Sequence, residues 1–349
     1  MKKYNLTAKT FAGLEPVLAK EIEKIGGQNV RTGRRAVFYE GNQELIYRSN
    51  YTLRTALRIL KEIVQFDFKD PDHFYLQCKK INWEKHLEVT HSFAVSSVVV
   101  HSRDFKNSMF ASLKVKDAIA DFFRQKHGKR PDVNTQNPDI IIHAHIRQNS
   151  CSLSLDSSGE SLHKRGYRVR QGEAPLSEVL AAGMIMLAEW EGQTDFIDPM
   201  CGSGTLPIEA AMIARNIAPG RFRKKYAFMN WRDFSPSLFE KIQEEQQKRP
   251  FLKKIYASDI SGGNVLTAQT NARRARVFSD IAFQTSDMKD LQLKTNNALI
   301  MINPPYGERL KHQNIHELYN MIGERLKHQF AGNTAWILTS SKTYLKNVG

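Results

Sequence analysis

The strongest chemical signal in the sequence is an acidic residue followed by a glycine-rich turn, the segment DPMCGSGT at residues 198–205. Glycines in such a turn let a ligand approach the backbone closely at the carboxyl end of a strand. The third glycine of a dinucleotide fingerprint is missing, and the Asp198 carboxylate would repel a pyrophosphate and attract a cation. S-adenosylmethionine (SAM) has a sulfonium, an amino group and no phosphate, so it fits this pattern. A turn that serves packing alone is the alternative.

Two more carboxylates follow the next expected strands. Asp259 ends the strand Lys254–Asp259, and Asp287 comes just after the strand Ile281–Thr285. A carboxylate at a strand tip can accept hydrogen bonds from ribose hydroxyls, and one on the neighbouring strand can accept an adenine amino group. Their separation matches one βαβ step of roughly 30 residues. A helix N-cap for Asp259 and an ordinary loop position for Asp287 are the alternatives.

The segment NPPYG at residues 303–307 follows the apolar strand residues 299–302. The Asn303 side-chain oxygen and the Pro304 carbonyl could each accept a hydrogen from the exocyclic amine of a base. That arrangement would aim the nitrogen lone pair at a methyl group by positioning rather than by a strong base. The two prolines, Pro304 and Pro305, stiffen the loop, and Tyr306 offers a face for stacking a flipped-out base.

These residues require a parallel sheet to bring them to one edge. From Leu176 onward strands and helices alternate, which is typical of an α/β sheet with right-handed crossovers. The expected strands are Thr194–Asp198, Lys254–Asp259, Ile281–Thr285, Ala298–Asn303 and Thr334–Ser340, and the expected helices are Thr205–Asn216, Gly262–Arg276 and Ile315–His328. Only nine residues follow Ser340, so we expect the sheet to lack its terminal strands.

The sequence pattern of the N-terminal half predicts two smaller α+β modules. Residues 1–66 have the order βαββαβ of a ferredoxin-like unit, with a hairpin that we expect to turn at Thr32-Gly33. Residues 67–158 form a basic mixed unit, which ends near the segment SSGE at residues 157–160. The expected elements of this second unit are a helix from His73, the strand Phe93–His101, the helix Ser108–His127 and the strands Ile140–Gln148 and Cys151–Asp156.

The composition indicates a soluble globular chain with a strong positive charge. The 349 residues include 51 Lys and Arg against 36 Asp and Glu, a net charge of +15. This excess favours a polyanionic partner, because neutralising phosphates releases counterions, although a basic solubilising surface is the alternative. No apolar stretch reaches the roughly 18–20 residues of a membrane span, and the N-terminus lacks a signal-peptide core. Three cysteines are too few for a disulfide framework. We therefore expect a cytoplasmic protein without membrane contact.

The motifs taken together resemble a known family. The glycine loop and NPPYG, in this order and spacing, resemble class I SAM-dependent N-methyltransferases. The segments KRGYR (164–168), APL (174–176) and NIAPG (216–220) narrow the resemblance to the THUMP-domain RNA guanine-N2-methyltransferases, in particular the bacterial large-subunit (23S) ribosomal RNA branch. The resemblance implies an α/β, Rossmann-like methyltransferase domain at 159–349, preceded by a ferredoxin-like subdomain at 1–66 and a THUMP domain at 67–158. The family pattern adds two strands beyond Ser340.

The resemblance implies a role for most of the residues named above. The catalytic residues would be Asn303, Pro304, Pro305 and Tyr306. The residues that bind SAM would be Asp198, Met200, Cys201, Gly202, Gly204, Thr205, Asp259, Ile260, Asp287, Met288, Tyr167 and Pro175. Glu209 either anchors the glycine loop or lies on a solvated helix face.

The candidate RNA contacts are basic residues, and those of the insertion after the glycine loop are interleaved with aromatic residues. They are Arg221, Arg223, Lys224, Lys225, Lys129 and Arg130. A solvated loop whose aromatic residues, Tyr226 and Trp231 among them, pack into the core is the alternative for the insertion. His143 and His145 alternate on one strand face without a third ligand nearby, so a structural role is favoured over a metal site.

The resemblance implies a methyl transfer from SAM to the N2 amine of a guanine in 23S ribosomal RNA or a large-subunit precursor. Transfer to tRNA guanine-N2 or to DNA adenine-N6 is the alternative within the same chemistry. A non-catalytic RNA-binding module is the alternative from another class. We expect no metal, and a monomer or weak dimer.

Overall fold

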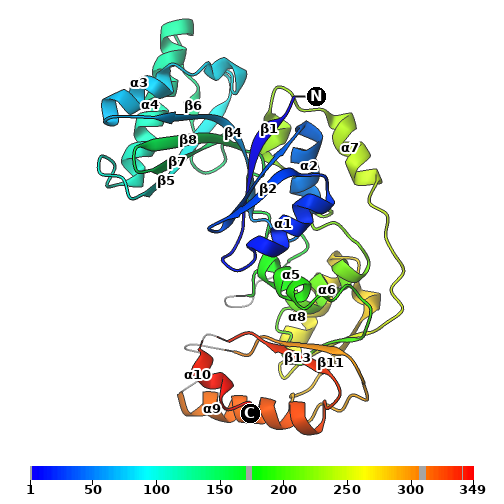
Figure 1. Ribbon diagram of the computed structural model, residues 1–349. Coiled ribbons are helices and arrows are strands. Elements are labelled where there is room, and N and C mark those ends of the chain that lie inside the picture. The colour runs from blue at the N-terminus through cyan, green and yellow to red at the C-terminus, as the bar shows by residue number, and fades with distance from the viewer. Residues whose placement is uncertain (1, 170–174, 306–311, 340) are drawn as a thin grey trace. The chain divides into compact units, whose positions relative to one another are not determined.

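The computed structural model describes residues 2–169, 175–305, 312–339 and 341–349, which form two compact units (Figure 1). The N-terminal unit contains Met1–Leu162 and Arg223–Glu245, and the C-terminal unit contains His163–Phe222 and Gln246–Gly349. Residues 223–245 (the insert) therefore fold with the N-terminal unit, although they lie within the expected catalytic domain 159–349. Among the described residues, no helix combines the length and apolar composition that crossing a bilayer requires.

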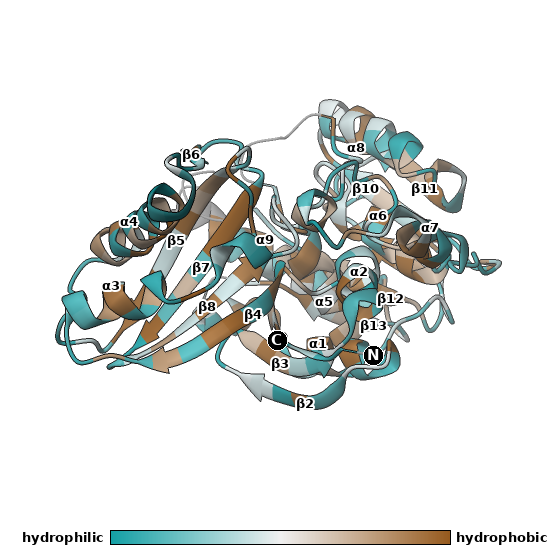
Figure 2. Ribbon diagram, turned by 90° about the horizontal axis from the view of Figure 1, so that it is seen from above, coloured by the Kyte–Doolittle hydropathy of each residue, from teal (hydrophilic) through white to brown (hydrophobic). Residues whose placement is uncertain are grey.

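One eight-stranded sheet forms the N-terminal unit. Its strands are β1 (Tyr4–Lys9), β2 (Gln28–Gly33), β3 (Ala36–Gly41), β4 (Arg58–Asp67), β5 (Ser92–Val100), β6 (Asp132–Val133), β7 (Ile140–Arg147) and β8 (Ser150–Asp156). Their order is β2-β3-β1-β4-β8-β7-β5-β6, and β4 pairs antiparallel with both β1 and β8. The expected boundary near residue 66 therefore does not interrupt the sheet. Hydrophobic residues gather along β4, β5 and β7 (Figure 2).

The helices of the N-terminal unit are α1 (Glu15–Lys24), α2 (Gln43–Thr52), α3 (Pro71–Lys79), α4 (Ser108–His127) and α7 (Pro236–Glu244), with 3-10 turns η1 (Trp83–Lys85) and η2 (Ala227–Asn230). Helix α4 begins where the Asn107 side chain accepts a hydrogen bond from the Met109 amide. It ends at Gly128, whose φ of 68° suits a left-handed C-cap.

The hairpin of the ferredoxin-like module turns two residues later than expected. Gly33 pairs with Ala36 as the last rung of β2 and β3, so the turn consists of Arg34 and Arg35. Arg35 has a φ of 53°, and its amide donates to the Glu15 carboxylate over 2.8 Å. This anchor from helix α1 stabilises a positive φ without glycine, which explains why the Gly33 signal misplaced the turn.

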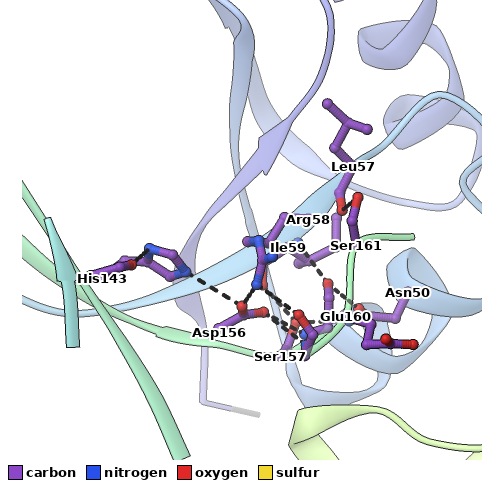
Figure 3. Close-up of polar contacts among 12 residues, drawn as sticks. Asn50, Leu57, Arg58, Ile59, His143, Asp156, Ser157, Glu160 and Ser161 are labelled. Carbon is purple, nitrogen blue, oxygen red and sulfur yellow. Dashed lines mark hydrogen bonds and ion pairs between the residues drawn. The ribbon is translucent and has the colours of Figure 1, made fainter. Parts of the chain in front are cut away.

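The end of β8 is a dense polar junction (Figure 3). Asp156 is fully buried, pairs with Arg58 and accepts hydrogen bonds from the Ser158 amide at 2.7 Å and the Gly159 amide at 3.1 Å. His143 lies 3.4 Å from the same carboxylate, and its pKa is lowered to about 3, mainly by burial and then by Arg58 and Lys9. These contacts join β4, β7 and β8 at the segment that leaves the unit.

Aromatic rings attach the insert to the ferredoxin-like module. The ring of Phe228 stacks on that of Tyr47 with centroids 4.4 Å apart, and Phe239 meets Tyr47 edge-on at 6.0 Å. Phe228 and Tyr47 are fully buried. Figure 1 shows α7, in yellow-green, beside the blue α2, and the two helices are in contact. Sequence reasoning missed α7 because a nine-residue helix in a charged insertion gives a weak periodic signal.

The C-terminal unit contains a five-stranded parallel sheet among its described residues. The strands are β9 (Phe196–Asp198), β10 (Ile255–Asp259), β11 (Ile281–Thr285), β12 (Leu299–Ile302) and β13 (Thr334–Ile337). The helices are α5 (Glu178–Leu187), α6 (Thr205–Ala214), α8 (Gly262–Arg274), α9 (His312–His328) and α10 (Lys342–Leu345), with a 3-10 turn η3 (Phe278–Asp280). The strand order is β11-β10-β9-β12-β13, with all neighbours parallel. The α/β fold class expected from the sequence is confirmed.

The strand order fixes where a ligand can bind. The chain moves from β9 outward to β10 and β11, then returns to the other side of β9 for β12. This reversal leaves a crevice at the carboxyl ends of the strands beside β9. Strands β9 and β12 are buried at every residue, and all ten residues of α6 are buried as well, so this edge rests on a continuous core.

Candidate cofactor pocket and catalytic loop

A cavity of about 560 Å³ lies at the carboxyl edge of the five-stranded sheet. It is lined by Pro175, Leu176, Asp198, Pro199, Met200, Cys201, Gly202, Ser203, Thr205, Leu206, Asp259, Ile260, Asn264, Asp287, Met288, Asn303, Pro304, Pro305, Leu318 and Met321. Most residues that the sequence nominated for cofactor binding and catalysis thus line one cavity. Three nominated residues are not among the lining: Tyr167, Gly204, which lies in the loop between the lining residues Ser203 and Thr205, and Tyr306, which falls outside the described residues.

Asp198 provides a buried carboxyl group at the tip of β9. It is only 1% exposed, and its side chain accepts a hydrogen bond from the Met200 amide at 3.1 Å. Burial raises its pKa to about 8; the Met200 amide acts in the opposite direction, and the Asp259 carboxylate adds to the rise. Such a group gains most from a cationic ligand, because a positive charge compensates for its lost hydration.

Asp259, at the tip of β10, ties the glycine loop to the next helix. One carboxylate oxygen accepts from the Gly202 amide at 2.9 Å, and the other accepts from the Ser261 amide at 2.9 Å and from Asn264 Nδ2 at 3.0 Å. A carboxylate has about four acceptor positions. Three are used within the protein, so the Asp259 side chain retains acceptor capacity for one ligand hydroxyl.

The two glycines of the loop, Gly202 and Gly204, have different structural roles. Gly202 lines the cavity with a φ of 54°, and a Cβ built there would meet open space. Gly204 has a φ of 84°, and a Cβ there would lie 2.9 Å from the Cβ of Ala268. Gly204 therefore allows α8 to approach the loop closely instead of contacting a ligand. The Cys201 thiol, just before Gly202, has its pKa raised well above the usual value, chiefly by burial, so it is not an activated nucleophile.

Asp287 follows β11 and closes a short turn. Its carboxylate accepts from the Lys289 amide at 3.0 Å and lies 3.5 Å from the Lys289 ammonium. The side chain is 24% exposed, and Asp287 lines the cavity together with the buried Met288. A polar acceptor beside an apolar surface is the combination that a purine ring with an amino group requires.

Asn303 follows the buried strand β12 and begins the NPPYG segment. Its side-chain oxygen, Oδ1, is buried and has no hydrogen-bond partner among the described residues. A buried acceptor without a donor costs roughly 1–3 kcal/mol, so such atoms are rare unless a ligand completes them. Asn303, Pro304 and Pro305 all line the cavity.

The KRGYR segment contacts α6, the helix whose first turn contributes Thr205 and Leu206 to the cavity lining. The Tyr167 hydroxyl donates to Glu209 at 3.1 Å, and an Arg165 guanidinium nitrogen lies 3.6 Å from the same carboxylate. All three side chains are buried. Tyr167 therefore anchors this segment to α6, and it is not among the described residues that line the cavity. Glu209 is buried and binds the KRGYR segment, whereas the sequence suggested an anchor of the glycine loop or a solvated helix position.

Sequence reasoning missed lining residues that lie on helices or just before one. Leu318 and Met321 are three residues apart on α9, Leu206 lies in the first turn of α6, Asn264 lies in the first turn of α8, and Leu176 precedes α5. The spacing of Leu318 and Met321 identifies an apolar helix face. It does not say which cavity that face covers.

The nominated RNA contacts fall into two groups. The guanidinium of Arg223 donates to four backbone carbonyls, those of Ser158, Glu160, Ser161 and Lys225. Arg223 thus braces the polar junction of Figure 3 from the insert, and its donors are used within the fold. The remaining candidates, Arg221, Lys224, Lys225, Lys129 and Arg130, are exposed.

Two aromatic residues of the insert, Tyr226 and Trp231, are not available for base stacking. Tyr226 is 3% exposed and Trp231 is 6% exposed. The alternative in which these rings pack into the core is therefore the one that the structure shows.

Three family models match successive parts of the chain. Residues 5–60 match a RlmL ferredoxin-like domain, residues 68–156 match a THUMP domain, and residues 165–348 match an RMKL-like methyltransferase domain. The last match covers more than half of the chain, and its range contains every residue of the cavity lining.

Proteins of similar sequence and structure agree with these matches. The chain is 38% identical over 347 residues to a "Ribosomal RNA large subunit methyltransferase K/L" of Vibrio parahaemolyticus, covering 97% of this chain and 49% of that protein. It is 33% identical over 341 residues to a "Putative RNA methyltransferase" of Synechocystis sp., covering 97% of this chain and 88% of that one. It thus spans about half the length of the large-subunit relatives that it matches.

One solved structure of similar fold contains the expected cofactor product. It is described as a "putative methyltransferase complexed with SAH" (S-adenosylhomocysteine), with a TM-score of 0.88 and 30% identity, and the match covers 100% of this chain and 93% of that one. These findings confirm the predicted resemblance and the expected cofactor class. The ferredoxin-like and THUMP matches, the cavity at the switch point and the catalytic-loop motif all lead to one conclusion: the chain belongs to the family of RMKL-like methyltransferases.

Proposed function

We propose that this protein transfers a methyl group from SAM to the N2 amine of a guanine in RNA, with large-subunit (23S) ribosomal RNA as the substrate. The observation that carries the proposal is Oδ1 of Asn303 at the wall of the cavity, which is buried and accepts no hydrogen bond from any residue that the structure describes. An exocyclic amine would supply a donor to this oxygen.

The residues of the cavity suit SAM. The buried carboxyl of Asp198 would pair with the amino group of its methionine part, and the remaining acceptor position of Asp259 would receive a ribose hydroxyl. Asp287 and Met288 offer an acceptor and an apolar surface for adenine. Bound there, SAM supplies an electrophilic methyl group.

The catalytic loop would orient the acceptor amine. Asn303 Oδ1 and the Pro304 carbonyl accept the two amine hydrogens, which draws the nitrogen lone pair out of conjugation with the base and towards the methyl group. No strong base is required, because the amine loses its proton to solvent after the new N–C bond has formed. Pro304 and Pro305 restrict the loop, so this geometry is largely preorganised.

RNA as the substrate is supported by charge and by the recognition modules. The chain has a net charge of +15, and its ferredoxin-like and THUMP regions share one sheet. The relatives that span these modules are named as RNA methyltransferases, among them enzymes of large-subunit ribosomal RNA. Guanine-N2 in RNA is therefore preferred over adenine-N6 in DNA, although both amines suit the loop.

The test is transfer of a tritiated methyl group from SAM to unmodified 23S RNA, tRNA and duplex DNA, followed by mass spectrometry of the digested nucleosides. Asn303→Ala should lower the transfer rate by about 10²–10³-fold, since one oriented polar group at the reacting centre is removed. Asn320→Ala, on the exposed face of α9, is the matched control and should transfer at the wild-type rate. Undiminished transfer by Asn303→Ala, or N6-methyladenine as the sole product, would refute the proposal.

A further inference from the structure

A buried ion pair lies next to the cavity without forming part of its lining. The Arg168 guanidinium is 3.1 Å from the Glu178 carboxylate, in the first turn of α5, and the two side chains are 10% and 6% exposed. Arg168 is absent from the residues that line the cavity, and so is Glu178. Neither side chain has a role in the chemistry proposed above.

The same guanidinium reaches two residues that do line the cavity. It donates a hydrogen bond to the Thr205 hydroxyl at 3.0 Å and to the Leu176 carbonyl at 3.2 Å. Thr205 is the first residue of α6 and ends the glycine loop, whereas Leu176 lies just before α5. One side chain thus connects two walls of the cavity that are separate in the sequence.

The environment makes this connection strong. Burial raises the pKa of Glu178, and the charge of Arg168 opposes that rise, so each charge stabilises the other in a site with little water. All three contacts are made by one guanidinium nitrogen, Nη2, so a single atom connects Glu178, Thr205 and Leu176. A second buried ion pair, Arg165 with Glu209, fixes the backbone just before Arg168.

We propose that Arg168 is a positioning residue for the cofactor: with Glu178 as its counter-charge, it fixes the distance between the Leu176 wall and the glycine loop and thereby sets the affinity for SAM and SAH. The inference rests on the proposed cofactor site and goes beyond it, since Arg168 is not among the residues that line the cavity. It predicts that removing the guanidinium weakens cofactor binding more than it slows methyl transfer at saturating SAM.

The experiment compares two arginines that lie at opposite ends of α6. Arg168→Met removes the guanidinium that binds Thr205 at the start of the helix. Arg215→Met removes the guanidinium just after the end of the helix, where Arg215 binds Asp280 at 2.7 and 3.1 Å, outside the cavity lining. Kd for SAH is measured by calorimetry, together with Tm, the KM for SAM and kcat. Arg168→Lys keeps the charge and is included in case the methionine variant does not fold.

We expect Arg168→Met to raise the Kd for SAH and the KM for SAM at least about tenfold, which corresponds to about 1.4 kcal/mol. We expect its kcat to stay within about threefold, and Arg168→Lys to have a Kd between those of the wild type and the methionine variant. Arg215→Met should lower the Tm about as much as Arg168→Met does and should keep the wild-type Kd for SAH. An unchanged Kd in both Arg168 variants, or an equal rise in Arg215→Met, would overturn the inference. Absence of SAH binding by the wild-type protein would instead contradict the proposed function.

Discussion

Asp198→Asn tests how the buried carboxyl of the cavity controls ligand binding. In the free protein the pKa of Asp198 is raised to about 8, mainly because burial penalises the charged form. The carboxyl is therefore mostly protonated at pH 7 and below. A ligand that brings an ammonium group requires the ionised form, so binding must first expel a proton.

The expected magnitude follows from the ionised fraction. Below the pKa this fraction falls tenfold for each pH unit, so the apparent Kd for SAH should rise about tenfold per unit as the pH falls from 7 to 5.5. The range stays below roughly pH 7.7, where the ligand's own amino group begins to lose its charge. Asp198→Asn has no carboxyl to titrate, and it should bind weakly with a Kd that does not change over this range.

Isothermal calorimetry at several pH values gives the slope, and two buffers of different ionisation enthalpy give the number of protons released. We expect about one proton per SAH for the wild type and none for Asp198→Asn. Asp290→Asn removes an exposed carboxylate outside the cavity lining and should keep the wild-type slope. A flat wild-type profile, or the same slope in Asp198→Asn, would show that Asp198 does not titrate on binding.

The same shift predicts how stability depends on pH. The folded-state pKa of Asp198 lies above its ordinary value of 3.8, so the folded protein holds the extra proton between these two values. Its contribution is complete below about pH 4 and is lost as the pH rises through about 8, by up to roughly 1.4 kcal/mol per pH unit. The Tm of the free wild type should therefore fall relative to that of Asp198→Asn as the pH rises from 5 to 8.

Two further predictions concern the N-terminal unit. Phe228→Ala deletes the ring stacked on Tyr47 and should lower the free energy of unfolding by about 3–5 kcal/mol in urea denaturation, whereas Phe278→Ala, at a partly exposed stack, should cost far less. Lys129→Ala should weaken RNA binding and reduce the slope of log Kd against log salt by up to about 1, with Kd for SAH unchanged; an unaltered slope would remove Lys129 from the RNA-contacting surface.

The sequence predicted local structure well where a periodic pattern ended at a clear signal. Helix α4 begins and ends at the expected residues, because Asn107 caps its start and Gly128 its end. The hairpin turn was misplaced because the anchor of Arg35, the Glu15 carboxylate, comes from a helix twenty residues earlier in the chain. A turn held by a tertiary contact has no local signature.

The candidate site was predictable to the extent that it depends on strand ends. Asp198 and Asp259 each end a strand and Asn303 follows one, and parallel strands bring their carboxyl ends to one edge. Contributions from helices were not predictable in this way, since the position of Met321 depends on how α9 packs. The role of Tyr167 beside the cofactor was implied by the family resemblance alone, and the hydrogen bond from its hydroxyl to Glu209 had no signal in the sequence.

The position of the insert in the sequence limits how recombination can exchange the two units. Residues 223–245 are encoded inside the methyltransferase stretch, 165–348, yet they complete the core of the N-terminal unit. No single cut of the gene separates the two units, because any fragment ending near residue 158 would leave Tyr47 without its aromatic partners. Recombination that exchanged the recognition modules alone would have to carry two separate gene segments. We therefore expect gene duplication and gene fusion to retain the coding segments of both units together.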